Sequence, residues 1–182
     1  MTSLLCGVTA GIFFTFGKYS TSLIGACFYQ TACILDNCDG EIARTKNLGS
    51  AFGSWFDIAT DFLTDLCLFG GIGLSLLLQS MDKGVLSVTI LCLFGTSMHV
   101  ILVIMEKLRG FGPAQHGNPN PGRRNGLSIF FDAIREGDVS WVVVLLALAG
   151  MAHALIWIGA FYMQILWITA LTVNYAHLTK PR

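Results

Sequence analysis

The chain has 182 residues, of which 54% are hydrophobic and 12% are charged, and its formal net charge is zero. A soluble globular domain carries about twice this share of charged residues, and the mean hydropathy of the chain is +0.66. This composition makes a soluble core the weaker interpretation, and we expect no nucleic-acid partner.

Apolar runs of membrane-spanning length recur along the whole sequence, so we expect an all-α, multi-pass integral membrane protein, in the cell membrane if the source is prokaryotic. A single domain is predicted over residues 1–182, with six transmembrane helices. The expected ranges are 2–16, 20–46, 50–79, 84–109, 138–152 and 155–178.

The first predicted helix follows the amino terminus without the basic residues that precede a signal peptide or a first transmembrane helix. We therefore expect the natural sequence to extend beyond this end. Glycines in the first and third predicted helices are interpreted as points where helices approach closely. These are Gly7, Gly11, Gly70, Gly71 and Gly73. The six cysteines have no metal-ligand spacing and are interpreted as small buried side chains.

The second and third predicted helices carry two pairs of acidic residues. Asp36 and Asp39 are three positions apart, and Asp57 and Asp61 are four positions apart, so each pair lies on one helical face. Both pairs lie near the turn between the two helices, and antiparallel packing would bring the carboxylates together. Within a membrane helix each ionised Asp costs about 2.5–3.5 kcal/mol, so these charges need a cavity or cations.

Divalent cations would neutralise this cluster, because few basic side chains lie nearby. Carboxylates are hard ligands that suit Mg²⁺ or Mn²⁺, and two such ions could clamp a diphosphate. Gly40, Ala43 and Gly53 each lie one turn from an acidic residue and would let a nucleotide approach the backbone. Arg44 could bind a phosphate in a bidentate manner, through two N–H donors of its guanidinium group. The pattern predicts a phosphate site filled with cations.

These residues match the pattern D-x-x-D-G-x-x-A-R-x(8)-G-x-x-x-D-x-x-x-D at all eight fixed positions. With this signature and the six-helix layout, the chain resembles the CDP-alcohol phosphotransferase (CDP-alcohol phosphatidyltransferase) family, especially its phosphoinositol-type branch. Members of the family usually have a Pro-Asn-x-x-Thr segment and an amphipathic helix before the first transmembrane helix. This chain starts at about that Thr, with Thr2.

The resemblance implies a homodimeric enzyme of phospholipid biosynthesis, of the EC 2.7.8 type. It would transfer a phosphatidyl group from a CDP-alcohol, usually CDP-diacylglycerol, to an acceptor hydroxyl and release CMP. Asp36, Asp39 and Asp57 would bind metal and the CDP diphosphate, with two Mg²⁺ or Mn²⁺ ions expected. Asp61 would help to hold metal and act as the general base. The residues implied to frame the nucleotide are Gly40, Ala43, Arg44 and Gly53.

After the fourth predicted helix, residues 110–126 are rich in Gly, Pro and Asn and are expected to form a mobile cytoplasmic loop. Residues 127–135 are compatible with a short helix at the membrane interface. If the first helix runs outward, nine Lys and Arg side chains lie inside and two, Lys18 and Lys83, lie outside. The catalytic cavity is therefore expected to open toward the cytosol.

The acceptor, a small alcohol such as a polyol or a polyol phosphate, is expected to bind between the third to sixth helices and the loop. Asp65, one turn beyond Asp61, could line its pocket. Three basic residues could bind a phosphorylated acceptor, although topology alone would also place them at cytoplasmic helix ends. They are Lys107, Arg109 and Arg135. His99, in the middle of the fourth helix, is interpreted as a packing residue.

Two other functions stay open from the sequence. One, in the same family, is a choline- or ethanolamine-type transferase that uses a CDP-aminoalcohol and diacylglycerol. The other is a divalent-cation transporter with the acidic residues along its ion path. A transporter would not require Gly40, Ala43, Arg44 and Gly53 at these offsets, and its acidic residues should extend toward both membrane faces.

Overall fold

The computed structural model describes residues 1–46, 51–80, 82–108 and 140–178, and these residues form helices and no strand. The bounds are α1 (Thr2–Thr15), α2 (Tyr19–Thr45), α3 (Ala51–Ser80), α4 (Lys83–Leu108), α6 (Ser140–Leu148) and α7 (Ala154–Leu178). The predicted all-α class is confirmed. Every described helix except α6 begins and ends within one residue of its predicted range.

The helix α6 ends at Leu148, four residues before the predicted end, because Gly150 stops it. Gly150 has a φ of 72°, and its N–H donates to Ala147 O at 3.0 Å. The N–H of Met151 donates to Leu146 O at 2.8 Å. This pair of bonds is the Schellman arrangement, which uses a left-handed glycine to satisfy the last carbonyls of a helix. Gly17, with a φ of 63°, follows the end of α1, and its N–H donates to Phe14 O at 3.2 Å.

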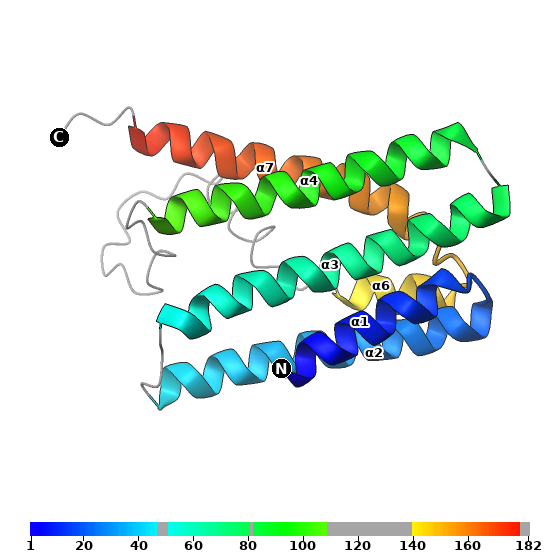
Figure 1. Ribbon diagram of the computed structural model, residues 1–182, viewed down its shortest axis with the longest axis horizontal. Helices are drawn as coiled ribbons and strands as arrows, with labels where there is room; N and C mark the ends of the chain where they lie inside the picture. Colours follow the sequence, from blue (N-terminus) through cyan, green and yellow to red (C-terminus); the bar gives the residue numbers. More distant parts are fainter. Residues whose placement is uncertain (47–50, 81, 109–139, 179–182) are drawn as a thin grey trace.

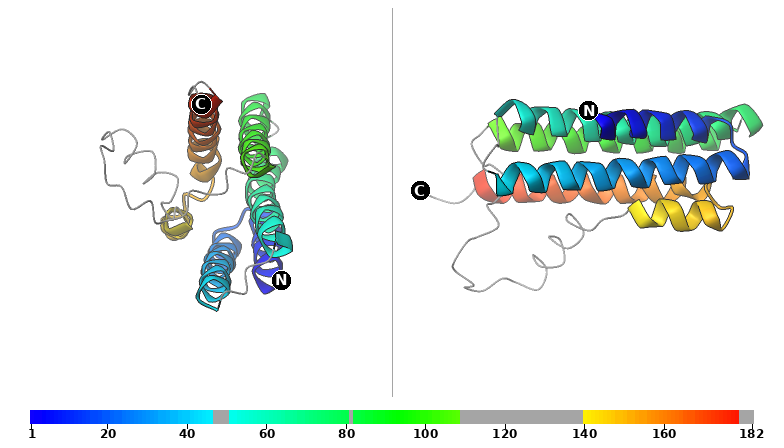
Figure 2. Two further views of the ribbon diagram at one scale, coloured as in Figure 1. Left: turned by 90° about the vertical axis from the view of Figure 1, so that its left-hand side faces the viewer. Right: turned by 90° about the horizontal axis from the view of Figure 1, so that it is seen from below.

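The long helices run side by side along one axis (Figure 1). Seen end-on, α2, α3, α4, α7 and α6 are arranged around a central region, and α1 lies between α2 and α3 (Figure 2). The start of α1 lies part-way along the bundle, so α1 accompanies only the portion of α2 and α3 that is distant from their connection at residues 46–51 (Figure 1).

Small residues bring α1 against both of its neighbours. A Cβ added to Gly7 would lie 2.5 Å from Thr64 Oγ1, and one added to Gly71 would lie 2.4 Å from Gly11 O. On the other side, a Cβ added to Gly25 would lie 3.1 Å from Ala10 O. The interpretation of Gly7, Gly11 and Gly71 as close-packing residues is confirmed. It is wrong for Gly70, which has no neighbouring atom within 4 Å.

The position of α1 corrects one expectation from the sequence. The described parts of α2 and α3 make few direct contacts with each other, and α1 packs extensively against both over the portion distant from their connection (Figure 1). The predicted antiparallel arrangement of these two helices is confirmed, but their predicted direct packing against each other is wrong. The acidic residues approach each other across a gap rather than across a tight helix pair.

Three helices are long and apolar enough to cross a membrane. They are Phe52–Ser80, Lys83–Met105 and Ala154–Thr172. In the described part of the chain α1 has 14 residues and α6 has 9, while α2 has 27 residues but a lower hydrophobicity. Large apolar side chains such as Leu78 and Phe161 are 70% and 72% exposed, as lipid-facing residues would be. The six predicted spans are thus supported by length and composition for three helices.

Candidate active site

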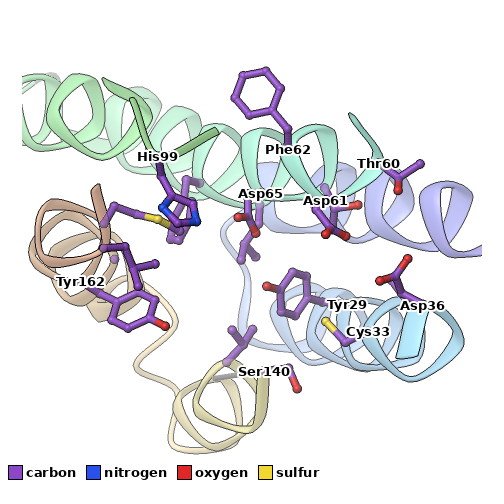
Figure 3. Close-up of a pocket in the computed structure, with 18 of the residues that line it drawn as sticks. Tyr29, Cys33, Asp36, Thr60, Asp61, Phe62, Asp65, His99, Ser140 and Tyr162 are labelled. Carbon is purple, nitrogen blue, oxygen red and sulfur yellow. The ribbon is translucent and has the colours of Figure 1, made fainter. Parts of the chain in front are cut away.

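A cavity of about 520 Å³ lies between α2, α3, α4, α6 and α7. Its walls are mostly apolar, with polar side chains contributed by α1, α2, α3, α4 and α7 and by the first residue of α6. Those labelled in Figure 3 include Tyr29, Asp36, Thr60, Asp61, Asp65, His99, Ser140 and Tyr162. Enzyme and ligand sites commonly combine an apolar cavity with a few converging polar groups. This cavity is the candidate active site.

Two of the signature carboxylates line the cavity from different helices. Asp36 lies on α2 and Asp61 lies on α3, on facing sides of the space (Figure 3). Asp61 is exposed to the cavity and Asp36 is half-buried. Asp39 and Asp57, the other members of the two pairs, are exposed and are not part of the cavity wall. The α2 and α3 helices therefore each place one signature carboxylate in the cavity wall and one outside it.

The four carboxylates are nevertheless close enough for their charges to interact. The negative charge of Asp61 is repelled by those of Asp36, Asp57 and Asp65. The negative charge of Asp36 is likewise repelled by those of Asp57 and Asp39. In the described ranges, no three Asp, Glu, His or Cys side chains converge on a point that could hold a metal ion. The residues form a coupled acidic group of the chemistry that hard divalent cations prefer. Their convergence on metal ions stays a prediction.

Asp65 lies one turn deeper than Asp61 on the same side of α3 and also lines the cavity. The hydroxyl of Tyr29, on α2, donates a hydrogen bond to its carboxylate. Its charge also acts on Tyr162 of α7 and Cys92 of α4. Asp65 is therefore directed into the space enclosed by several helices rather than toward lipid.

Comparison with known proteins decides the family. The family model described as CDP-alcohol phosphatidyltransferase matches residues 1–173. The chain belongs to this family. It is a membrane-bound transferase of the EC 2.7.8 type that acts in phospholipid biosynthesis. The family generally depends on divalent metals.

A solved structure shares the fold of this CDP-alcohol phosphatidyltransferase. It is the crystal structure of Mycobacterium tuberculosis phosphatidylinositol phosphate synthase (PgsA1) in apo form, with 19% sequence identity and a TM-score of 0.57. The similarity covers 93% of this chain and 84% of that chain. No curated protein sequence matches the chain significantly.

The residues expected to frame the nucleotide lie at the end of the bundle where α2 finishes and α3 begins. Gly40, Ala43 and Arg44 belong to the last turns of α2, and Gly53 belongs to the first turn of α3. The side chains of Ala43 and Arg44 lie outside the described part of the transferase. Their predicted contact with a nucleotide stays a prediction.

The structure separates the predicted acceptor-binding residues. Asp65 lines the cavity, whereas Lys107 does not. Lys107 Nζ lies over the ring of Trp55, 4.5 Å from the ring centroid, and donates a hydrogen bond to Ser54 Oγ. Arg109 and Arg135 lie outside the described residues, as do the predicted loop at 110–126 and the predicted interfacial helix at 127–135.

Sequence reasoning missed Tyr29, Tyr162 and the location of His99. The structure places half-buried His99 on the cavity wall, where it was expected only to pack between helices. A signal for Tyr29 was present, because it precedes Asp36 by seven residues, which is two helical turns on one face. His99 and Tyr162 gave no comparable signal, since their direction depends on how α4 and α7 are rotated.

Proposed function

We propose that the transferase moves a phosphatidyl group from CDP-diacylglycerol to a hydroxyl of a polyol or polyol phosphate and releases CMP. The observation that carries this proposal is that Asp36 and Asp61, from two halves of the family signature, face each other across one cavity. The fold shared with a phosphatidylinositol phosphate synthase supports the phosphoinositol-type branch over a choline-type enzyme. Membership of a transferase family sets aside the divalent-cation transporter.

In this proposal Asp36, Asp39 and Asp57 hold two Mg²⁺ or Mn²⁺ ions and, with them, the diphosphate of the donor. The donor set fits, because it consists of charge-coupled carboxylates from facing helices. Bound divalent ions would neutralise the diphosphate and the charge that develops on it. Gly40, Ala43, Arg44 and Gly53 would frame the cytidine nucleotide at the same end of the bundle.

Asp61 is proposed as the general base and as a further metal ligand. The acceptor oxygen attacks the phosphorus that carries the diacylglycerol group, and its proton passes to the Asp61 carboxylate. The bond from this phosphorus to the bridging oxygen breaks, and CMP leaves with that oxygen. A base must lie within hydrogen-bond reach of the hydroxyl it deprotonates, and Asp61 is the more exposed of the two signature carboxylates that line the cavity.

We also propose that the signature end of the bundle faces the cytosol and that the enzyme is a homodimer. Lys46 and Lys107 lie at this end, and Lys18 and Lys83 lie at the opposite end (Figure 1). Basic residues concentrate on the cytoplasmic side of membrane proteins, where CDP compounds are available. The family resemblance supports the dimer.

The test is CMP release by the purified full chain in detergent. We expect release with CDP-diacylglycerol and one of a panel of polyols, only when Mg²⁺ or Mn²⁺ is present, and loss of release with EDTA. Release from CDP-choline or CDP-ethanolamine with diacylglycerol would assign the protein to the choline- or ethanolamine-type branch of the family. Absence of metal-dependent CMP release with every donor would overturn the proposal.

A further inference from the structure

The deep part of the cavity, beyond the signature carboxylates, has its own polar groups. Asp65 follows Asp61 by one helical turn, which places their backbones about 6 Å apart along α3. Tyr29 faces this space from α2, His99 from α4 and Tyr162 from α7 (Figure 3). The family signature does not include any of these four residues. We call the part of the cavity lined by these four residues the deep chamber. They are Tyr29, Asp65, His99 and Tyr162.

A carboxylate such as Asp65 in a purely structural position inside a membrane would raise the free energy of the folded state. A carboxylate placed inside a membrane helix bundle is retained where it lines a functional cavity or pairs with a cation. Its hydrogen-bond donor is Tyr29, and its charge repels that of Asp61. The hydroxyl of Tyr29 holds the carboxylate in the chamber from the facing helix. A carboxylate held this way has further oxygen lone pairs available as acceptors.

The charges around the chamber define the chemistry of a suitable ligand. Among the described residues that line the cavity, the charged side chains are acidic, and neither Lys nor Arg is present. A phosphate group in the chamber would be repelled by Asp61 and Asp65. A neutral group with several hydroxyls would instead donate hydrogen bonds to the carboxylate. It could also donate hydrogen bonds to the tyrosine hydroxyls and accept hydrogen bonds from them.

We propose, building on the transferase function above, that Asp65 and Tyr29 hold the acceptor alcohol and select a polyol. One hydroxyl of the polyol donates to Asp65 while another, two or more carbons away, reaches Asp61 and the donor phosphorus. The separation of about 6 Å between the two positions on α3 matches such a molecule. Any phosphate that the polyol carries remains toward the open end of the cavity. Asp65 and Tyr29 are positioning residues, and Asp61 accepts the proton.

The test measures CMP release at saturating CDP-diacylglycerol while myo-inositol, glycerol, their phosphate monoesters and ethanolamine are each varied. For Asp65→Asn we expect the KM of the accepted polyol to rise about tenfold or more, the scale of a lost hydrogen bond to a charged group. For Tyr29→Phe we expect a smaller rise of the same KM. The KM of CDP-diacylglycerol should stay within about twofold, because the donor binds at the signature carboxylates.

Matched controls come from the far end of the bundle. Tyr19→Phe removes a hydroxyl that donates to Leu148 O, and Asp82→Asn changes a carboxylate that accepts from Gly84 N at 2.9 Å. Both controls should leave both KM values unchanged. Thermal unfolding in detergent checks that each variant is folded. If Asp65→Asn does not fold, Tyr29→Phe alone tests the inference. The KM of the polyol should then rise more than the KM of CDP-diacylglycerol.

Three results would overturn the inference, and the first two of them would leave the proposed function intact. The wild type would release CMP, but the acceptor KM would not change in the folded chamber variants. Alternatively, the KM of CDP-diacylglycerol would change as much as that of the acceptor. Or ethanolamine would be the acceptor and Asp65→Asn would abolish its use, which would assign the chamber to an ammonium group. A wild type without metal-dependent CMP release overturns the proposed function itself.

Discussion

Asp36 and Asp61 occupy positions that the other two signature carboxylates do not. Both line the cavity, whereas Asp39 and Asp57 are exposed outside its wall. A proton can be taken from an acceptor alcohol only by a group within hydrogen-bond reach of it. Asp61 is also the one whose charge is coupled to Asp65, in the deep chamber. The geometry therefore favours Asp61 over Asp39 and Asp57 as the base.

Changing Asp61 to Asn should abolish proton acceptance while keeping the size of the side chain. We expect kcat for CMP release to fall by about 10²–10⁴, the usual contribution of a general base. Binding of CDP in the presence of Mg²⁺, measured by calorimetry in detergent, should be largely retained. Asp82→Asn, at the start of α4, is the control and should have wild-type activity, because Asn also caps helices.

Two outcomes would change this assignment. Full activity of Asp61→Asn would remove Asp61 from the reaction. Recovery of activity at high Mg²⁺ would show that the lost group is a metal ligand and not the base.

At the residue scale, local spacing predicted the signature residues and Asp65, but not the other residues of the deep chamber. The signature residues Asp36, Asp39, Asp57 and Asp61 lie at fixed offsets along two helices, so the sequence alone identifies them. Tyr162 and His99 reach the cavity because of how α4 and α7 are rotated about their axes. That rotation is set by packing between distant segments, which no local pattern encodes.

At the scale of the helices, too, local sequence predicted the helix ends but not how distant helices pack. Glycines and short polar turns stop the helices, so most helix ends were predicted within one residue. The insertion of α1 between α2 and α3 was not predicted, since it depends on glycines of three helices meeting in space. The sequence indicated that these glycines pack closely, and the structure shows which partner each one meets.

Adjacent glycines in α3 offer a matched test of this packing. A Cβ at Gly71 would meet the backbone oxygen of Gly11 at 2.4 Å, and a backbone atom cannot move aside cheaply. Gly71→Ala should therefore lower the free energy of unfolding by roughly 1–3 kcal/mol. Gly70 has no atom within 4 Å, so Gly70→Ala should be neutral or stabilise α3 by about 0.5–1 kcal/mol.

The measurement is unfolding of both variants in detergent titrated with SDS. Equal destabilisation by the two substitutions would contradict the close approach of α1 to α3. The acceptor KM should change in neither variant, because both glycines lie outside the cavity wall.

A contact between the side chains of Lys107 and Trp55 joins α4 to α3 at the signature end. Lys107 Nζ lies 4.5 Å from the Trp55 ring centroid. A partly exposed cation–π contact is worth about 0.5–1 kcal/mol. A double-mutant cycle of Trp55→Leu and Lys107→Met should give a coupling energy of this size, measured by unfolding in detergent. A coupling near zero, together with a raised acceptor KM in Lys107→Met, would instead assign Lys107 to acceptor binding.

At the scale of the whole molecule, the two ends of the bundle differ in what they carry. The signature residues lie at the end where α2 finishes and α3 begins, and the opposite end holds the turns around Gly17 and Gly150 (Figure 1). A lipid-linked donor is amphiphilic, and its CDP group must come from the side where that nucleotide is made. The orientation of the bundle therefore decides whether the proposed reaction is possible.

Exposed positions near the two ends allow the orientation to be measured. Thr45 lies at the signature end, and Ser20 and Ser80 lie at the opposite end, all with exposed side chains. Single cysteines at these positions, in a variant without the six native cysteines, would be treated in intact cells with a membrane-impermeant maleimide. We expect labelling of Ser20→Cys and Ser80→Cys but not of Thr45→Cys, which should react only after the membrane is opened. The reverse pattern would place the signature carboxylates outside the cell, away from CDP-diacylglycerol synthesis, and would contradict both the positive-inside prediction and the proposed donor.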